Sequence, residues 1–274
     1  MAWSERQTAM LRAMGLRTWQ APTVPTVPAA VAVLSAVFAP DQAAAPVHVH
    51  VPDPAPIAVP IAAPKTLAMH VERAEYDSIR TLDWPALREA AAGCRACVLC
   101  ESRKQTVFGA GHTQARWMII GEAPGAQEDA EGEPFVGAAG QLLDSMLRAL
   151  GLSRSDDGDP AKSVYIANTL KCRPPGNRNP APEEMARCEP FLQRQIELLQ
   201  PRIILAMGRF AVQALLRSSE PVGRLRGRVH RYQGVPLVVT YHPAYLLRNM
   251  ADKAKAWDDL CLAADTMDTQ QAVL

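Results

Sequence analysis

Six cysteines have the clearest chemical potential in this sequence of 274 residues: Cys94, Cys97, Cys100, Cys172, Cys188 and Cys261. The first two form a Cys-x-x-Cys pair, and the others are spread along the rest of the chain. In a reducing cytosol disulfides are rare, so clustered cysteines are interpreted first as ligands of a metal or a metal cluster. The sequence therefore predicts a thiolate-bound metal centre.

A second group of polar side chains follows four short apolar runs, at 117–120, 164–167, 202–206 and 235–240. The segments after these runs contain most of the candidate site residues: Gly121 to Asp129, Asn168, Gly208 with Arg209, and Tyr241 to Asn249. In open α/β sheets the ligand crevice lies at the carboxyl ends of the strands. We therefore expect the four segments to converge on one site.

The elements that position this site are predicted from the alternation of apolar runs with helical stretches at 139–150, 182–199, 208–217 and 251–264. Continuous apolar strands alternating with helices are typical of a parallel sheet covered on both faces. We expect an α/β fold with three α/β/α layers around a central, four-stranded, mainly parallel sheet, in a domain that spans residues 86–274.

The first 85 residues have a different composition. Residues 3–19 predict a short helix, and residues 1–20 are interpreted as a peptide that binds a partner. Ten of the 23 prolines fall between residues 21 and 65, where they remove backbone donors and fix φ. Residues 21–85 are therefore predicted to form a largely disordered, partly polyproline linker.

The overall charge and hydropathy exclude some classes of protein. The formal net charge is only +1, so charge that binds nucleic acid must be local. No apolar run approaches the roughly 18 to 20 residues that cross a bilayer. The N-terminus lacks a basic segment followed by an apolar one. We expect a cytoplasmic, monomeric protein that does not enter membranes.

Three segments resemble the signature segments of family 4 uracil-DNA glycosylases, the iron–sulfur type: Gly121 to Asp129, Lys171 to Pro180 and His242 to Asn249. The resemblance extends from about Cys94 to about Leu260. It implies an enzyme of base excision repair that flips uracil out of DNA, hydrolyses its N-glycosidic bond and leaves an abasic site. One alternative is a uracil-DNA-binding protein on the same fold, either non-catalytic or covalently trapping, with His230 as the candidate nucleophile. Another is an accessory nucleic-acid module of a polymerase.

The same resemblance implies which cysteines bind the cofactor. It places a [4Fe–4S] cluster on Cys94, Cys97, Cys172 and Cys188. A tetrahedral zinc ion on four thiolates is the alternative. Cys100 is interpreted as a bystander because the family pattern places the second ligand at Cys97, and Cys261 is expected to pack in the core.

Recognition of uracil requires a group that donates to O4 and accepts from N3–H. One asparagine amide does both, and cytosine presents the reverse pattern. Asn168, at the end of a predicted strand, is the candidate. Phe135 is expected to stack on the flipped base, and Ala123 and Gly125 complete the predicted substrate contacts.

Cleavage of the glycosidic bond develops negative charge on uracil. His242 is predicted to donate to O2 and to stabilise that charge. The third residue of the first segment is Ala123, whereas better-known uracil glycosylases have an aspartate there. The carboxylate that positions the water is therefore predicted to be Glu122 first and Glu128 second.

The predicted DNA contacts combine cations with apolar wedges. Four arginines fall within eight residues from Arg224 to Arg231, and they would neutralise phosphates. Leucines after the last strand are expected to enter the gap left by the flipped base. The predicted DNA-binding residues are Arg178, Arg226, Arg228, Leu246, Leu247 and Arg248.

The N-terminal peptide carries a second resemblance. The stretch from Leu11 to Trp19 resembles the N-terminal peptide of the psi subunit of bacterial DNA polymerase III holoenzyme, which docks on the chi subunit. A peptide tethered by a proline-rich linker suits such a contact. The resemblance implies that the chi subunit is a partner.

Overall fold

The computed structural model of the chain describes residues 78–271. The predicted N-terminal peptide and most of the predicted linker lie outside the described residues. None of the helices between residues 78 and 271 is both long enough and apolar enough to span a bilayer.

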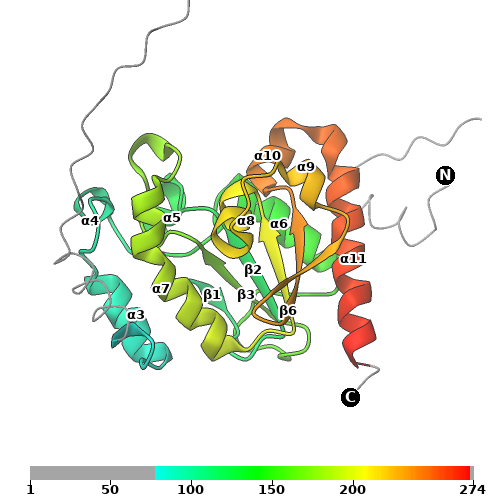
Figure 1. Cartoon of the computed structure of the whole chain (residues 1–274), viewed down its shortest axis with the longest axis horizontal. Helices are drawn as coiled ribbons and strands as arrows, with labels where there is room; N and C mark the ends of the chain where they lie inside the picture. The colour runs from blue at the N-terminus through cyan, green and yellow to red at the C-terminus, as the bar shows by residue number, and fades with distance from the viewer. Residues whose placement is uncertain (1–77, 272–274) are drawn as a thin grey trace, which may run out of the picture.

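Six strands form one sheet in the order β1-β3-β2-β4-β6-β5 (Figure 1). Their bounds are β1 (Ala110–Gly111), β2 (Trp117–Gly121), β3 (Val164–Asn168), β4 (Ile203–Met207), β5 (Val229–Tyr232) and β6 (Val235–Thr240). The central strands β3, β2, β4 and β6 pair in parallel and lie within one residue of the four predicted runs. Because each is buried along nearly its whole length, each reads as a continuous apolar run.

The predicted number of four strands is too low, because two antiparallel edge strands flank the parallel core. β1 pairs with β3 and β5 pairs with β6. β1 has two residues, which is too short for a periodic signal. β5 alternates between exposed and half-buried side chains. It contains His230 and Arg231 of the arginine-rich stretch, so its sequence indicated a basic segment and not a strand.

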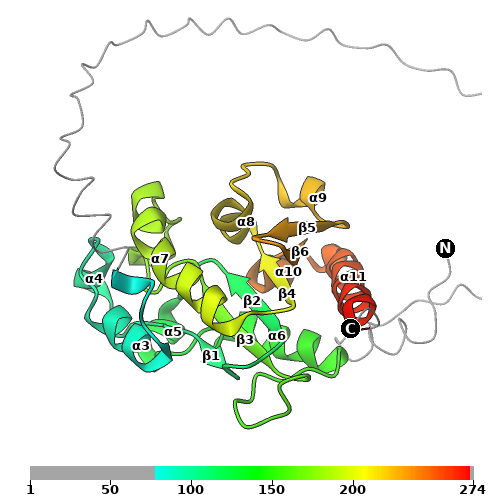
Figure 2. The same ribbon diagram turned by 60° about the horizontal axis from the view of Figure 1, so that its bottom comes forward.

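Helices cover both faces of this sheet, which confirms the three predicted layers (Figure 2). α6 (Ala138–Ala149), α10 (Pro243–Arg248) and α11 (Lys253–Gln271) pack on one face, and α7 (Pro182–Leu199), α8 (Arg209–Leu216) and α9 (Val222–Leu225) pack on the other. The remaining helices are short or peripheral: α3 (Trp84–Gly93), α4 (Leu99–Ser102), α5 (Ala126–Glu131), η1 (Pro175–Asn177) and η2 (Met250–Asp252).

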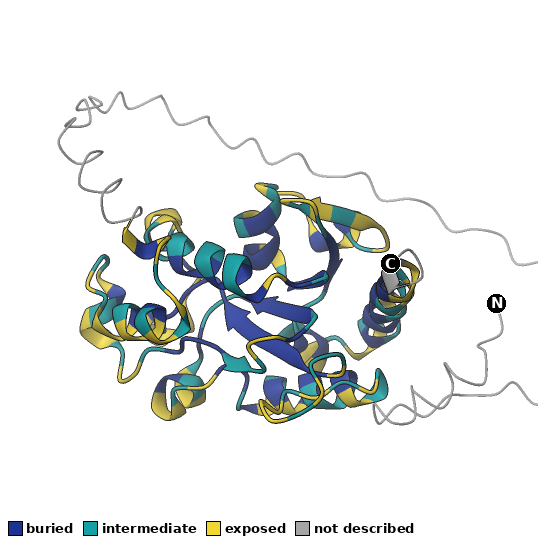
Figure 3. Ribbon diagram, turned by 90° about the horizontal axis from the view of Figure 1, so that it is seen from below, coloured by how far each residue is buried: buried dark blue, intermediate teal, exposed yellow. Residues whose placement is uncertain are grey.

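Successive residues of each central strand contribute to opposite halves of the core. Trp117 and Ile119 of β2 pack with α6 and α11, whereas Met118 and Ile120 pack with α7 and α8. This alternation follows from the two-residue period of a strand. The strands are therefore buried from both sides, as the burial colouring of Figure 3 shows.

Packing extends to residues before the predicted domain boundary at 86. Asp83 caps α3, where its carboxylate accepts a hydrogen bond from the backbone N–H of Ala86 (3.0 Å). Ile79 is buried in a small apolar cluster with Leu87 and Phe191. The folded part therefore includes residues that the composition had assigned to the linker.

Candidate active site

One large cavity, of about 880 Å³, lies at the carboxyl ends of the four parallel strands. Each of the four predicted segments contributes to its wall, which confirms that they converge. The residues that directly follow or end the strands include Glu122 after β2, Asn168 in β3, Gly208 after β4 and His242 after β6. The geometry agrees with the rule that ligands bind at this edge of an open α/β sheet.

Asn168 is the last residue of β3 and is only 2% exposed. Its backbone is fixed by the parallel register with Gly121, and the next two amides donate to the carbonyls of Gly121 and Glu122 (3.1 Å each). Its side-chain Oδ1 is buried and has no hydrogen-bond partner among the described residues. A buried acceptor without a partner costs about 1–3 kcal/mol, so this atom at the cavity wall is suited to a ligand donor.

Gly121 leaves the room that Asn168 and Phe135 occupy. A Cβ at this position would lie 2.5 Å from Asn168 Oδ1 and 2.6 Å from Phe135 Cζ. Both contacts are far shorter than van der Waals separation. A side chain at residue 121 would therefore push two predicted base-binding groups out of place.

Gly121→Ala should lower the rate of base excision on the order of 10²-fold, because displacement of binding groups by about 1 Å has effects of that size. The measurement is a single-turnover assay at saturating enzyme. Gly93→Ala is the matched control, since a Cβ at Gly93 meets nothing within 4 Å. A Gly121→Ala rate within twofold of wild type would contradict the assigned geometry.

Phe135 is held in a left-handed backbone conformation, with φ of 56°. Its carbonyl lies so close to Gly140 that a Cβ there would be 1.7 Å from the oxygen. The ring is buried at the cavity wall and stacks on the imidazole of His242, with ring centroids 5.3 Å apart. Phe135 and His242 therefore form one continuous aromatic surface within the cavity.

His242 is the N-cap of α10, and its Nδ1 accepts a hydrogen bond from the backbone N–H of Ala244 (3.2 Å). Burial, together with the nearby charge of Arg248, lowers the pKa of His242 to about 4, although the charge of Glu128 opposes the shift. The ring is therefore neutral at physiological pH. Because Nδ1 is an acceptor, the single proton is on Nε2, which makes that atom a hydrogen-bond donor.

A neutral His242 predicts a specific pH dependence. The rate of the chemical step should not fall through titration of this ring between pH 8 and pH 6, and should fall only as pH approaches 4. The unfolded chain takes up this proton near pH 6.5, so His242 should lower the stability of the fold as pH falls from about 7 to 4. NMR titration of the His242 ring measures the midpoint directly. A midpoint near 6.5 would contradict the predicted neutral state.

The two candidate carboxylates occupy different environments. Glu128 accepts hydrogen bonds from three backbone amides, those of Gly125 (3.1 Å), Val136 (3.2 Å) and Gly137 (3.3 Å). Its oxygens therefore fix the loop around α5. Glu122 is half-buried at the cavity wall; burial raises its pKa, and the positive charge of Arg209 opposes that rise. Both carboxylates line the cavity, and they differ in that the oxygens of Glu128 accept from backbone amides.

The structure contradicts one of the predicted DNA contacts and places ion pairs on two others. Leu246 is completely buried in the core, so it is not accessible as a wedge. The guanidinium of Arg226 is paired with the buried carboxylate of Asp259 (2.9 Å) and ties the loop before β5 to α11. Arg178 forms two hydrogen bonds with Glu184 at the start of α7. Leu246 is therefore excluded as a wedge, whereas Arg178 is exposed at the wall of the large cavity with its guanidinium group paired.

The other predicted DNA contacts are exposed. Leu247 is 42% exposed, directly beside the buried Leu246. Arg228 and Arg248 are exposed as well, and Arg248 lies at the cavity wall. These three side chains are therefore accessible from solvent, and Arg248 is also accessible from the cavity.

The cavity wall also contains residues that lie within the predicted segments but were not predicted as site residues. Arg209 begins α8 at the cavity wall and lies close enough to Glu122 to lower its pKa. Tyr241 and Tyr245 flank His242 with stacked rings, 5.0 Å between centroids. Their position directly after strands was the available signal, but short segments do not show which side chains face inward.

Five cysteines surround a second, small cavity of about 20 Å³: Cys94, Cys97, Cys100, Cys172 and Cys188. They come from the end of α3, the turn before α4, α4 itself, the loop after β3 and the middle of α7. Arg103 donates from Nη1 to Cys172 Sγ (3.1 Å), and the backbone N–H of Lys171 donates to Cys188 Sγ (3.2 Å). The fold therefore brings together all four predicted ligands, with Cys100 beside them, and Cys261 packs against the core elsewhere.

Three thiols of this cysteine cavity are shifted toward the protonated form. Burial raises the pKa of Cys97 and Cys172, and raises that of Cys188 to about 12. A metal centre that binds them must displace protons. Between residues 78 and 271 no group of three or more His, Cys, Asp or Glu side chains is placed as the ligands of a single metal ion would be.

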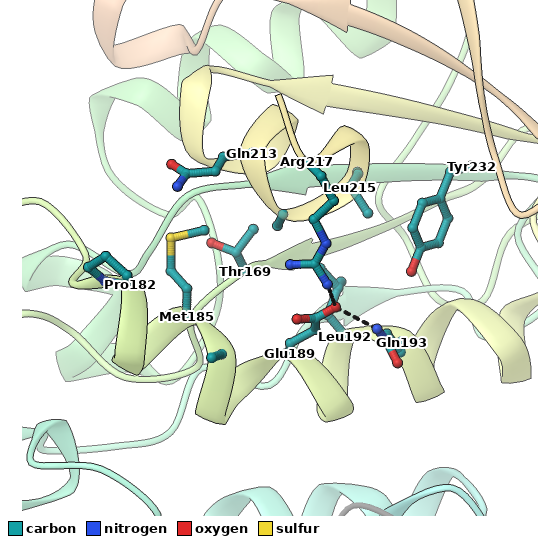
Figure 4. Close-up of a pocket in the computed structure, with 12 residues that line it drawn as sticks. Thr169, Pro182, Met185, Glu189, Leu192, Gln193, Gln213, Leu215, Arg217 and Tyr232 are labelled. Atoms are coloured by element: carbon teal, nitrogen blue, oxygen red, sulfur yellow. Dashed lines mark hydrogen bonds and ion pairs between the residues drawn. The ribbon is translucent and has the colours of Figure 1, made fainter. Parts of the chain in front are cut away.

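A third cavity, of about 170 Å³, lies between α7 and α8 (Figure 4). Arg217 at the end of α8 forms an ion pair across it with Glu189 of α7, and Gln193 donates to the same carboxylate (2.6 Å). Thr169, next to Asn168, reaches its wall. The cavity contains none of the predicted site residues, and its ion pair joins the two helices that cover one face of the sheet.

Comparison with known proteins defines the class to which this fold and site belong. The sequence model of the uracil DNA glycosylase superfamily matches residues 108–261. That range contains every strand of the sheet and all four segments that line the large cavity.

Curated relatives place the chain more narrowly. It is 43% identical over 191 residues to the type-4 uracil-DNA glycosylase of Pyrobaculum aerophilum, which covers 66% of this chain and 93% of the relative. It is 43% identical over 162 residues to that of Archaeoglobus fulgidus, with 56% and 78% covered, and 44% identical over 165 residues to that of Saccharolobus solfataricus, with 57% and 73% covered. The chain belongs to the type-4 uracil-DNA glycosylase family.

Proposed function

We propose that this protein is a monofunctional uracil-DNA glycosylase, which excises uracil from DNA in base excision repair and leaves an abasic site. The observation that carries the proposal is the buried amide of Asn168. Its Oδ1 has no hydrogen-bond partner within residues 78–271 and lies at the wall of a cavity large enough for a nucleoside. Membership of the type-4 family supports the same activity.

Uracil would be recognised after it leaves the base stack. Asn168 Oδ1 would accept from N3–H, and its Nδ2 would donate to O4, a pattern that cytosine cannot satisfy. The base would lie over the ring of Phe135, beside the imidazole that already stacks there. Ala123 and Gly125 at the same wall are proposed as further substrate contacts.

The bond between uracil N1 and the sugar breaks as electrons move into the base. His242 Nε2–H would donate to uracil O2 and stabilise the developing anion. Because the imidazole is neutral and its Nδ1 is bonded to the α10 backbone, the donor is oriented before the substrate arrives. Loss of one such donor costs a factor of about 10² to 10³ in other enzymes.

Glu122 would hold the attacking water and stabilise the positive charge that develops on the sugar. Arg209 lies near enough to favour the ionised form of this carboxylate, while burial disfavours it. Glu128 would act indirectly, since its bonds to three amides fix the loop that carries Ala123 and Gly125.

DNA would be held at the rim of the cavity by Arg228 and Arg248, with Leu247 as the wedge that fills the gap in the duplex. Their exposure supports these roles. Arg226 and Arg178 would contribute through the loops that they stabilise, because their guanidinium groups are already paired.

The deciding experiment is release of free uracil from a uracil-containing oligonucleotide. Uracil release followed by alkali-sensitive strand cleavage is the expected result, and intact glycosidic bonds at high enzyme concentration would refute the activity. A denaturation-resistant protein–DNA adduct would indicate the trapping alternative. The position of His230 favours release, since its Nε2 lies 2.7 Å from the carbonyl of Leu225 and the residue does not line the cavity.

We also propose that Cys94, Cys97, Cys172 and Cys188 bind a [4Fe–4S] cluster. The convergence of their side chains on one cavity, with N–H groups directed at two of the sulfurs, supports the proposal. The cluster would tie α3, the loop after β3 and α7 together. Broad absorption near 400 nm with iron in the purified protein is expected; a colourless protein that contains stoichiometric zinc would favour the alternative ion.

Residues 1–20 are proposed to bind the chi subunit of DNA polymerase III holoenzyme, with residues 21–85 as a tether. Pull-down of chi by the full chain, lost on Trp19→Ala, is the expected result, and binding unaffected by that change would refute the contact. A cytoplasmic location and a monomeric state stay predictions from the sequence.

A further inference from the structure

A buried lysine stands between the large cavity and the cysteine cavity. Lys171, three residues after Asn168, is only 2% exposed. Its Nζ donates to the backbone carbonyl of Asn168 (2.9 Å) and to Oε1 of Gln195 in α7 (2.6 Å). Gln195 in turn donates from Nε2 to the carbonyl of Phe108 (2.9 Å) and to the hydroxyl of Tyr165 in β3 (3.1 Å).

The backbone of Lys171 is bonded to the opposite side, toward the cysteines. Its N–H donates to Cys188 Sγ (3.2 Å), and its carbonyl accepts from the amide of Val107 (2.8 Å). The next residue is Cys172, and both Lys171 and Cys172 line the cysteine cavity. One residue therefore has its side chain bonded to the carbonyl of Asn168 and its backbone bonded to a predicted cluster ligand.

The energetic cost of this arrangement suggests that it has a role. The two bonds of Nζ go to a carbonyl and to an amide oxygen, neither of which is charged. Burial of a polar amine costs free energy that its hydrogen bonds must offset, and a methionine would fill similar volume without that cost. Replacement of buried charges by apolar side chains often leaves stability unchanged or increases it. Packing alone therefore does not account for a lysine here.

We propose that Lys171, together with Gln195, is a positioning residue for uracil recognition. The hydrogen bond from its Nζ fixes the backbone carbonyl of Asn168, and so the turn from residue 168 to 171 and the direction of the Asn168 side-chain amide. The backbone N–H of Lys171 donates to Cys188, and the next residue is Cys172. The direction of the Asn168 amide therefore also depends on the position of the loop that carries Cys172. The inference rests on the proposed glycosylase function and adds a residue that does not touch the base.

Lys171→Met tests this role in the full-length protein. The single-turnover rate of uracil release should fall about tenfold or more, as misplacement of a binding group would cause. Inhibition by free uracil should weaken in parallel. The ratio of the excision rate of uracil to that of cytosine should decrease. The midpoint of thermal unfolding should be equal to or above that of wild type, and iron content with absorption near 400 nm should be unchanged. A purely structural lysine would instead lower the unfolding midpoint and leave the folded protein with wild-type uracil affinity.

The matched control is Lys253→Met, which removes another buried lysine, 6% exposed, at the start of α11 and outside the cavity wall. It should release uracil at the wild-type rate. Where Lys171→Met fails to fold or loses iron, Gln195→Leu decides, because it removes the acceptor of Lys171 from α7 without altering the cysteine loop. A reduced rate and weaker uracil inhibition in Gln195→Leu support the proposal.

Wild-type rates and wild-type uracil inhibition in folded, iron-loaded Lys171→Met, or in Gln195→Leu, would overturn the positioning role. Release of uracil by the wild-type protein, measured in the same series, tests the underlying function separately. Absence of release from the wild-type protein would refute the glycosylase proposal, and the role of Lys171 with it.

Discussion

Replacement of His242 by alanine should lower the rate of the chemical step on the order of 10²-fold or more, with little change in the affinity for uracil-containing DNA. The reason is the state of the ring in the folded protein. Nδ1 is occupied by the amide of Ala244, and burial keeps the ring neutral, so Nε2–H is the one donor that the imidazole presents. Its hydrogen bond to the base would strengthen as negative charge develops.

Two comparisons separate this role from the part that His242 plays as a helix cap. His112 makes the same local contact, with Nδ1 accepting from Gln114 N–H (3.0 Å), but lies outside the large cavity, so His112→Ala should retain the wild-type rate. His242→Asn keeps an acceptor for the cap and removes the Nε2 donor, so it should be nearly as slow as His242→Ala. A His242→Asn rate close to wild type would show that the cap alone matters.

The second large effect is expected at Asn168. Asn168→Asp should reduce uracil excision by roughly 10²- to 10⁴-fold, since two buried hydrogen bonds worth about 1–3 kcal/mol each would be lost or opposed. An ionised aspartate accepts but does not donate, so it would repel uracil O4 and would accept from the exocyclic amine of cytosine. Excision of cytosine should therefore rise relative to uracil.

Parallel single-turnover assays on uracil- and cytosine-containing oligonucleotides measure this change in selectivity. Asn249→Asp is the matched control, because Asn249 caps the end of α10 and does not line the cavity. It should leave both rates unchanged. Unaltered selectivity in a folded Asn168→Asp variant would remove the recognition role of Asn168 and the principal support for the proposed function.

These effects depend on an arrangement in which recognition, leaving-group stabilisation and water positioning come from different strand ends. Asn168 ends β3, His242 follows β6 and Glu122 follows β2. Parallel pairing places these ends at one edge of the sheet, and the backbone bonds from Thr169 and Leu170 to the first segment fix their spacing. These three groups are therefore anchored at the ends of the strands of the sheet.

The sequence by itself determined the parallel core of the sheet, its helices and the edge that carries the site. The four central strands are buried on both faces, so each leaves an unbroken apolar run, and the residues that follow such runs must meet. The cysteine pattern likewise predicted one group of ligands, but only the tertiary structure brings these side chains around one cavity. Local patterns missed the two edge strands, because one has only two residues and the other has one side exposed.

The tertiary structure alone decided which members of each segment reach the cavity. Leu246 and Leu247 are adjacent and chemically identical, yet one is in the core and the other is exposed. Arg226 is paired with a carboxylate 33 residues away, and Glu128 is bonded to amides up to nine residues along the chain. Lys171 acquires its role from Gln195, 24 residues later. Such contacts depend on where distant segments pack, and no local periodicity or composition encodes that information.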